Sequence, residues 1–228
     1  MTTTTWLVLL VGPLAAYVIG STPFGVIIAR AHGIDLRAAG SGNVGATNVG
    51  RVVGRRWGYV CFVLDVAKGL VPTAVAGWLL RRDGVPTTVD QLTWLAVALA
   101  AVAGHVLSFW LKFRGGKGVA TSLGVVLGFW PYFTLPGLMA LGLWIAVTLR
   151  WRYVSLGSIV AAGAFPILFV ATALVVGWPL AEMLILAAFA VAVAGLIVYR
   201  HRGNIARLRA GTENAIGRRG RADSADRS

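Results

Sequence analysis

Three polar stretches interrupt an otherwise apolar sequence, and each has residue types suited to holding phosphate or moving a proton. The first, Gly40–Asn48, alternates glycines with hydroxyl and amide side chains, and Arg51 follows it. Glycines admit positive φ angles and close backbone approach, so consecutive amides can point at one anion. A turn between two apolar helices would also contain glycines, but it would not need this density of donors. The candidate anion ligands are Ser41, Gly42, Asn43, Thr47 and Asn48.

The second stretch places cations and glycines just before an apolar segment. It reads Lys112-Phe113-Arg114-Gly115-Gly116-Lys117-Gly118, and Thr121 follows in the apolar segment. The free amides and positive dipole end of a helix starting here would face the same loop as the cations, which favours phosphate binding. Membrane anchoring would explain the sign of the charges but not the glycine pair. The loop is not a Walker A motif, because Gly118 follows Lys117 where Ser or Thr is required.

The third stretch, Arg200–Asn214, carries a histidine and an asparagine that could act together. In a helix, His201 and Asn204 are i, i+3 neighbours on one face. The surrounding cations are expected to lower the pKa of His201 and to favour neutral imidazole, the form that a general base needs. A lone histidine at a membrane boundary is also commonly just an interfacial residue, so His201 by itself does not establish catalysis.

Charged and polar residues inside apolar segments are a second kind of candidate, because burying charge in lipid is costly. Asp65 and Lys68 stand at i, i+3 and are expected to pair in the interior. The pair could be structural, or it could support a site; the structural role is favoured. His105 could be functional or a buried packing residue. The single cysteine, Cys61, offers no disulfide and no metal cluster, so no metal or cofactor is expected.

The elements that must position these residues are membrane helices. Of the 228 residues, 57% are hydrophobic and 13% are charged, and the mean hydropathy is +0.77, too apolar for a soluble domain. The formal charge of +13 does not indicate nucleic-acid binding, because the cations stand between apolar runs. The predicted spans are Trp6–Ala29, Trp57–Leu80, Leu92–Leu111, Val119–Trp130, Tyr132–Leu149, Val154–Val176 and Leu180–Tyr199.

The charges predict the topology of these seven spans. Basic residues follow the first, third, fifth and seventh spans, so the positive-inside rule puts these segments in the cytoplasm and the N-terminus outside. The segment 119–149 is divided because Pro131 and Pro136 interrupt it, and an undivided segment would put the later cations on the wrong side. We expect one all-α integral membrane domain over residues 1–216 and a basic, disordered cytoplasmic tail over 217–228.

Together the three stretches resemble the motifs of the bacterial acyl-phosphate-dependent glycerol-3-phosphate acyltransferases. The matching strings are G-S-G-N-V-G-A-T-N-x-x-R from Gly40, K-F-R-G-G-K-G-V-A-T after Gly104-His105, and R-H-x-x-N-I-x-R-L-x-x-G-T-E from Arg200. The D-V-A-K-G string at Asp65 is similar too, so the resemblance runs from Gly20 to Gly217. It departs at Leu107-Ser108, where Phe-Pro is common, and at Gly203, where an acidic residue is usual; these changes concern loop shape and acyl-pocket lining more than the reaction.

The resemblance implies a multi-pass enzyme of phospholipid biosynthesis in the bacterial cell (inner) membrane. It would transfer an acyl group from fatty acyl phosphate to the sn-1 hydroxyl of glycerol 3-phosphate, giving lysophosphatidate and phosphate. Carried over by position, Ser41, Arg51, His201 and Asn204 are the essential residues. The glycines around Lys117 would bind phosphate, and Glu213 would be structural. No metal, organic cofactor or nucleic acid is implied.

Acyl phosphate is already activated, so the protein mainly has to position two anions and stabilise the oxyanion. We expect Lys117, Arg51 and Arg114 to hold the phosphates while Ser41 and Asn204 orient the acceptor. Either His201 or a substrate phosphate could be the base, and direct transfer is favoured over an acyl-serine. Two other classes compete: a transporter for a phosphorylated solute, whose sites would meet at the bilayer midplane, and a non-catalytic scaffold for anionic lipid.

Overall fold

All regular structure in the described part of the chain is helical. The computed structural model describes residues 1–82 and 87–216, so the predicted tail at 217–228 lies outside the described residues. The elements are α1 Thr3–Ser21, α2 Phe24–Ala31, α3 Ala46–Val52, α4 Arg55–Leu80, α5 Thr88–Val106, η1 Phe109–Leu111, α6 Val119–Gly128, α7 Thr134–Trp151, α8 Val154–Val176, α9 Leu180–Arg200 and α10 Arg202–Arg209.

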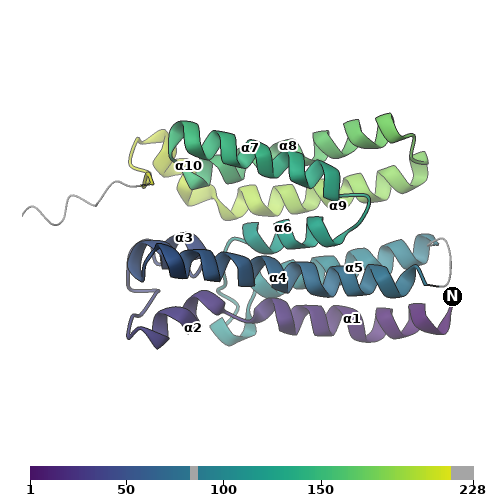
Figure 1. Cartoon of the computed structure of the whole chain (residues 1–228), viewed down its shortest axis with the longest axis horizontal. Coiled ribbons are helices and arrows are strands. Elements are labelled where there is room, and N and C mark those ends of the chain that lie inside the picture. The colour runs from purple at the N-terminus through teal and green to yellow at the C-terminus, as the bar shows by residue number, and fades with distance from the viewer. Residues whose placement is uncertain (83–86, 217–228) are drawn as a thin grey trace, which may run out of the picture.

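The helices form two groups that meet at α6. Helices α1, α4 and α5 pack on one another and α4 packs closely on α6, whereas α8 packs between α7 and α9. Figure 1 shows the first group below, the second above, and the short α6 between them. The bundle therefore has a junction at α6, where side chains from both groups meet.

Each predicted span contains a helix, but the helices are not all long enough to cross a bilayer. Five spans pass by length and composition, and a sixth is the pair α9 and α10 if this pair, bent by 57°, counts as one. Helix α6 has ten residues, about 15 Å at 1.5 Å per residue, or roughly half of the 30 Å hydrocarbon core. The all-α membrane fold is confirmed, and the number of complete crossings stays a prediction.

The first predicted span, Trp6–Ala29, corresponds to one candidate membrane span, Thr3–Ala31, which the structure breaks into two helices between Ser21 and Phe24. Pro23 has no amide hydrogen and disfavours helical backbone at the residue before it. The carbonyl of Thr22 accepts from Lys68 Nζ at 2.9 Å, and Lys68 pairs with Asp65 at 2.7 Å. The predicted ion pair is therefore present and buried, and Lys68 is a second donor to the Thr22 carbonyl, which also accepts from the Phe24 amide at 3.1 Å.

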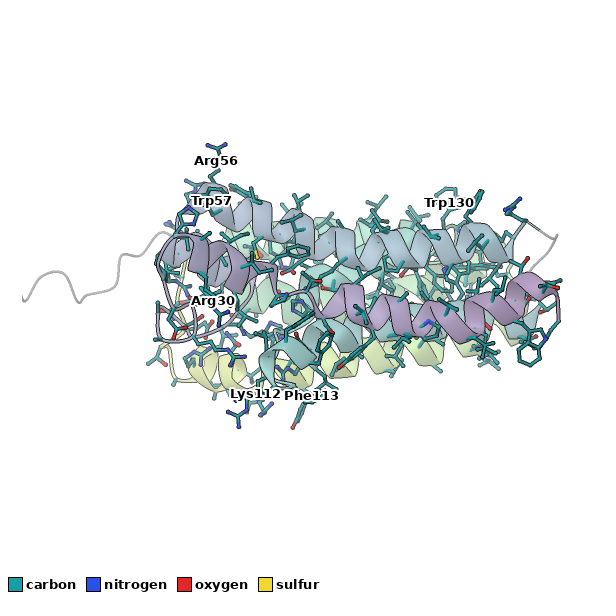
Figure 2. All side chains as sticks on the ribbon, turned by 90° about the horizontal axis from the view of Figure 1, so that it is seen from below. Arg30, Arg56, Trp57, Lys112, Phe113 and Trp130 are labelled. Atoms are coloured by element: carbon teal, nitrogen blue, oxygen red, sulfur yellow. The ribbon has the colours of Figure 1, made fainter. Side chains whose placement is uncertain are left out.

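The four predicted cytoplasmic segments lie at one end of the bundle. Arg37 donates to the carbonyl of Arg114 (3.0 Å), Arg200 to that of Gly115 (3.0 Å), and the Ile216 amide to that of Arg152 (2.7 Å). In Figure 2, the labelled Arg30, Arg56 and Lys112 lie toward this end, and Trp130 lies toward the other. The sharing of one end by these basic segments is thus observed directly.

Aromatic side chains pack together where α6 turns into α7. Phe133 lies 4.9 Å from Phe129, 5.5 Å from Phe165 and 5.1 Å from Phe169, measured between ring centroids. All four rings are buried. We call Phe129, Phe133, Phe165 and Phe169 the aromatic layer; it joins α8 to the α6–α7 connection.

Close contact between α4 and α6 predicts that a methyl group at Gly124 is destabilising. A Cβ there would lie 2.0 Å from the carbonyl oxygen of Val66, a backbone atom that cannot turn away. We expect Gly124→Ala to cost about 1–3 kcal/mol by overpacking and to lower the thermal midpoint in detergent. Gly163 is the control, because nothing lies within 4 Å of its Cβ position. Gly163→Ala should leave the midpoint unchanged or raise it; equal losses in both variants would contradict this account.

Candidate active site

The second polar stretch forms a loop that folds back onto the end of α5. Helix α5 stops at Val106, five residues before the predicted end of that span at Leu111, because the returning loop binds its last carbonyls. The amide of Gly115 donates to Val106 O at 3.0 Å, and that of Gly116 donates to His105 O at 3.1 Å. A Cβ at Gly116 would lie 2.3 Å from His105 Nε2, so glycine permits this close approach. Residues Gly115–Gly118 are called the phosphate loop below.

The phosphate loop leads directly into the N-terminus of α6. Gly118 has a φ of 88° and precedes the helix. In the described part of the chain, Ser122 is the first residue of α6 whose amide donates to a carbonyl, that of Gly118 at 2.7 Å. The amides before it are unpaired and sit at the positive end of the helix dipole, an arrangement suited to an anion.

Lys117 connects the phosphate loop to the C-terminal segment. Its Nζ donates to Asn204 Oδ1 at 2.5 Å, and Asn204 Nδ2 donates to Glu213 Oε1 at 2.7 Å. Glu213 also accepts from Arg207 Nε at 2.8 Å and from Ser155 Oγ at 3.0 Å. Glu213 thus fixes the Asn204 amide so that its oxygen faces Lys117, in keeping with the structural role that the resemblance implies.

The electrostatic environment of Lys117 is strongly cationic. Burial lowers the pKa of Lys117 to about 8; Glu213 opposes this shift, and Arg207, Arg200 and Arg51 add to it. Arg51 comes from α3 and follows the first polar stretch, so a charge from that part of the chain also acts on Lys117. Cations from three separate segments are therefore concentrated around one ammonium group, which attracts anionic substrates.

His201 lies at the junction of α9 and α10, and one of its ring nitrogens makes no hydrogen bond within residues 1–82 and 87–216. Its Nδ1 is 2.7 Å from the carbonyl oxygen of Ile197, so Nδ1 carries the hydrogen and Nε2 keeps its lone pair. Burial lowers the pKa of His201 to about 4, with smaller contributions from Lys117 and Arg200. This lowered pKa favours the neutral imidazole, and burial is a larger cause of the shift than the surrounding cations.

The first polar stretch uses several of its candidate ligands internally. Asn48 Nδ2 donates to the carbonyls of Leu36 (3.2 Å) and Ala39 (3.0 Å), and its Oδ1 accepts from the Ser41 amide at 2.9 Å. Asn43 Oδ1 accepts from the Gly45 amide at 2.9 Å. The two asparagines therefore hold the loop in shape.

The other candidate residues of the two loops differ in how far they are exposed on the surface. Ser41, Gly42, Thr47 and Arg51 are exposed, as are Lys112 and Arg114, whereas Thr121 is fully buried beneath the phosphate loop. Lys112 and Phe113 point outward from the bundle in Figure 2. No contact between the Ser41 side chain and Lys117 or His201 is seen in residues 1–82 and 87–216.

Two arginines that sequence reasoning did not single out hold the loops in place. Arg200 Nη2 donates to the carbonyls of Gly115 and Gly116, both at 3.0 Å. Arg37 Nη2 donates to those of Leu111 (3.2 Å) and Arg114 (3.0 Å). Arg200 is the first residue of the third motif and Arg37 precedes the first motif, but the carbonyl partners of both carry no signal in a sequence. Beneath the loop, His105 Nδ1 lies 3.8 Å from Asp65, beyond hydrogen-bond distance.

An apolar cavity of about 90 Å³ lies between α6, α7, α8 and α9, next to this cluster. Its lining includes Val119, two residues after Lys117, and Ile197, whose carbonyl binds His201. Other lining residues are Ser122, Val126, Ala140, Ala162 and Phe165. Cationic and apolar surfaces therefore adjoin, which suits an amphiphile with an anionic head.

A family model and several named relatives match this chain. The model for "Glycerol-3-phosphate acyltransferase" matches residues 10–211. The glycerol-3-phosphate acyltransferase of Geotalea daltonii is 43% identical over 94% of this chain and 100% of its own length. That of Geobacter sulfurreducens is 47% identical over 87% of this chain and 93% of its own length.

Solved structures of an integral membrane protein share the fold. The crystal structure of PlsY (YgiH), a glycerol 3-phosphate acyltransferase, in its glycerol 3-phosphate form aligns with a TM-score of 0.76 at 39% identity, covering 92% of this chain and 96% of that one. Its lysophosphatidic acid form gives 0.75 at 37% identity, covering 92% and 95%. Family model, relatives and fold agree, and the chain belongs to the glycerol-3-phosphate acyltransferase family, a family of integral membrane enzymes.

Proposed function

We propose that this protein transfers the acyl group of a fatty acyl phosphate to the sn-1 hydroxyl of glycerol 3-phosphate. An ester bond forms between the acyl carbon and the sn-1 oxygen, and the bond from that carbon to the donor phosphate breaks. The hydroxyl proton leaves to a base, and the products are lysophosphatidate and inorganic phosphate. The reaction would be an initial step of phospholipid synthesis.

The observation that carries this proposal is the Lys117–Asn204 hydrogen bond. It joins the phosphate loop to the segment with His201, so an anion-binding group and a neutral imidazole lie at one place. The apolar cavity begins beside both of them. A phosphate, a proton acceptor and an acyl chain could thus be accommodated within one small region.

In the proposed mechanism, the cations offset the negative charge of the two substrate phosphates and hold these phosphates in position. Lys117, Arg51 and the free amides of α6 hold the two substrate phosphates, with Arg114 at the exposed rim. Asn204, oriented by Glu213, and Ser41 direct the acceptor hydroxyl. Neutral His201 is a suitable base through Nε2, and a phosphate oxygen of the substrate is the other candidate. Fixed donors would stabilise the oxyanion that develops on the acyl carbonyl.

We further propose that the acyl chain of the donor occupies the cavity between α6 and α9. Its lining is almost wholly apolar, and it extends from Val119 and Ile197 into the bundle. An acyl chain there would continue directly from a phosphate bound at Lys117. Membrane lipid would supply the donor from the side.

The proposed orientation puts the basic end in the cytoplasm of a bacterial cell, with seven crossings and the N-terminus outside. In this arrangement α6 and the loops at its two ends make the fourth crossing together. The positive-inside rule supports it, because the basic segments share one end of the bundle. Soluble glycerol 3-phosphate would then reach the site from the cytoplasm.

Acceptor-dependent phosphate release tests the function. Purified protein given acyl phosphate should release phosphate only when glycerol 3-phosphate is present. Lys117→Met should reduce this release about 100-fold or more, because a preorganised charge is lost. Arg150→Met removes an exposed charge at the same end of the bundle and is the matched control, with activity near that of the wild type. Release that ignores the acceptor would refute the proposal.

The lowered pKa of Lys117 predicts a fall in kcat/KM for glycerol 3-phosphate above about pH 8. The ammonium form binds phosphate and is lost as pH rises through the pKa, whereas bound phosphate favours that form, so kcat should fall less. In Lys117→Arg the guanidinium stays charged. This variant should therefore lose the alkaline fall even if it is slower. The same fall in both proteins would show that another group titrates.

Direct transfer predicts that no acyl-enzyme forms. Rapid mixing with radiolabelled acyl phosphate alone should leave Ser41 unlabelled, since no base lies beside its side chain in the described residues. Ser41→Ala should then retain some activity, because its role is orientation. Covalent label on Ser41, absent from Ser41→Ala, would replace direct transfer with a two-step mechanism.

A further inference from the structure

We infer that Phe165, held by the aromatic layer, sets the upper limit of acyl-chain length. This inference rests on the proposed function, because it assigns the apolar cavity to the donor's acyl chain. Phe165 is the aromatic-layer residue that lines the cavity.

The cavity runs along the helices from the phosphate loop toward the aromatic layer. On α6 its lining extends from Val119 to Val126, and on α8 from Ser158 to Phe165. Each interval is seven residues, or about 10 Å of helix. The end near Val119 adjoins the cations, so a chain whose phosphate is bound there points toward Phe165.

Both small and large residues line the cavity, and Phe165 lies at its far end. Ala140, Ala162 and Ala194 leave space along the walls, whereas bulkier parts of the wall come from Phe62, Leu123, Leu141 and Trp144. Phe165 has only 6% of its surface exposed. A chain that reaches this ring must bend, leave the cavity or displace the ring.

The ring of Phe165 is held by edge contacts that resist displacement. It packs against Phe133 with centroids 5.5 Å apart at 66°, and Phe133 packs in turn on Phe129 and Phe169. Such edge-to-face pairs add to the stabilisation from burial. Because protein interiors are densely packed, moving Phe165 would require the other rings to move as well.

The opposite end of the cavity has a polar group without a partner. Ser122 lines the cavity, is 4% exposed, and its hydroxyl makes no hydrogen bond among the described residues. A buried hydroxyl without a partner is costly, so a ligand oxygen would be its natural acceptor. An acyl phosphate meets this requirement, because its carbonyl lies next to the phosphate. The cavity thus has a polar end and an apolar end in the order that the donor requires.

The test compares saturated acyl phosphates from hexanoyl to lauroyl as donors, because the shorter chain ends before Phe165 and the longer one reaches it. Phe165→Ala should raise the ratio of kcat/KM for lauroyl phosphate to that for hexanoyl phosphate by about tenfold, as expected if roughly two more methylene groups of the longer chain are buried. Ala162→Phe, placed midway along the cavity, should lower the same ratio. Phe169→Ala is the matched control; it also removes a ring packed on Phe133, but Phe169 does not line the cavity. Its ratio should match the wild type.

Three outcomes would overturn this inference, and a fourth would refute the proposed function instead. An unchanged ratio in active Phe165→Ala overturns it, and so does an equal change in Phe169→Ala, which would indicate general loosening. If Phe165→Ala does not fold, Ala162→Phe decides, because an unchanged ratio there also overturns the inference. Wild-type protein that transfers no acyl group from any donor refutes the proposed function instead.

Discussion

The structure depends on satisfying backbone carbonyls where helices end inside an apolar bundle. Lipid offers no hydrogen-bond donors, so each freed carbonyl needs a donor from the protein. Cationic side chains supply several of them, and most of these bonds join segments that are far apart in the sequence. The long-range pairs are Lys68 with Thr22, Arg37 with Arg114 and Arg200 with Gly116, whereas Arg81 binds Gly77 at the end of its own helix. Many of the basic residues are therefore part of the framework, and Lys117 and Arg51 remain available for substrate.

This division explains how much of the site could be predicted from the sequence. Lys117, His201 and Asn204 are recognisable from residue type and spacing, and the structure brings them together. Arg200 and Arg37 are not, because their partners are carbonyls of distant residues, which carry no sequence signal. Asn48 looked like a ligand, but its amide holds its own loop. A motif can identify an important residue, but it does not identify the atom that this residue contacts.

Much of the fold could also be predicted from the sequence. The prediction failed where backbone geometry determines where a helix breaks. Apolar segment length correctly located the helices of all seven predicted spans, and the charges correctly grouped the basic segments at one end. The break at Pro23 was missed, since hydropathy does not distinguish a helix from apolar residues outside one, whereas the division at Pro131 correctly separated the short α6 from α7. Membership of an acyltransferase family also disfavours the transporter alternative. The position of the polar cluster disfavours it too, because the cluster lies at one end of the bundle and not at its middle.

The half-length α6 has a consequence for how the two substrates meet. Its first residues are set back from the basic end of the bundle in Figure 1. The phosphate loop therefore lies farther from that end than α3 and α10 do. In the proposed reaction the lipid donor would not have to rise out of its leaflet toward water. The soluble acceptor would instead descend along the cations to the depth where the acyl carbonyl already lies. Because α6 is short, the water-soluble acceptor, and not the lipid donor, would have to move across the membrane interface in the proposed reaction.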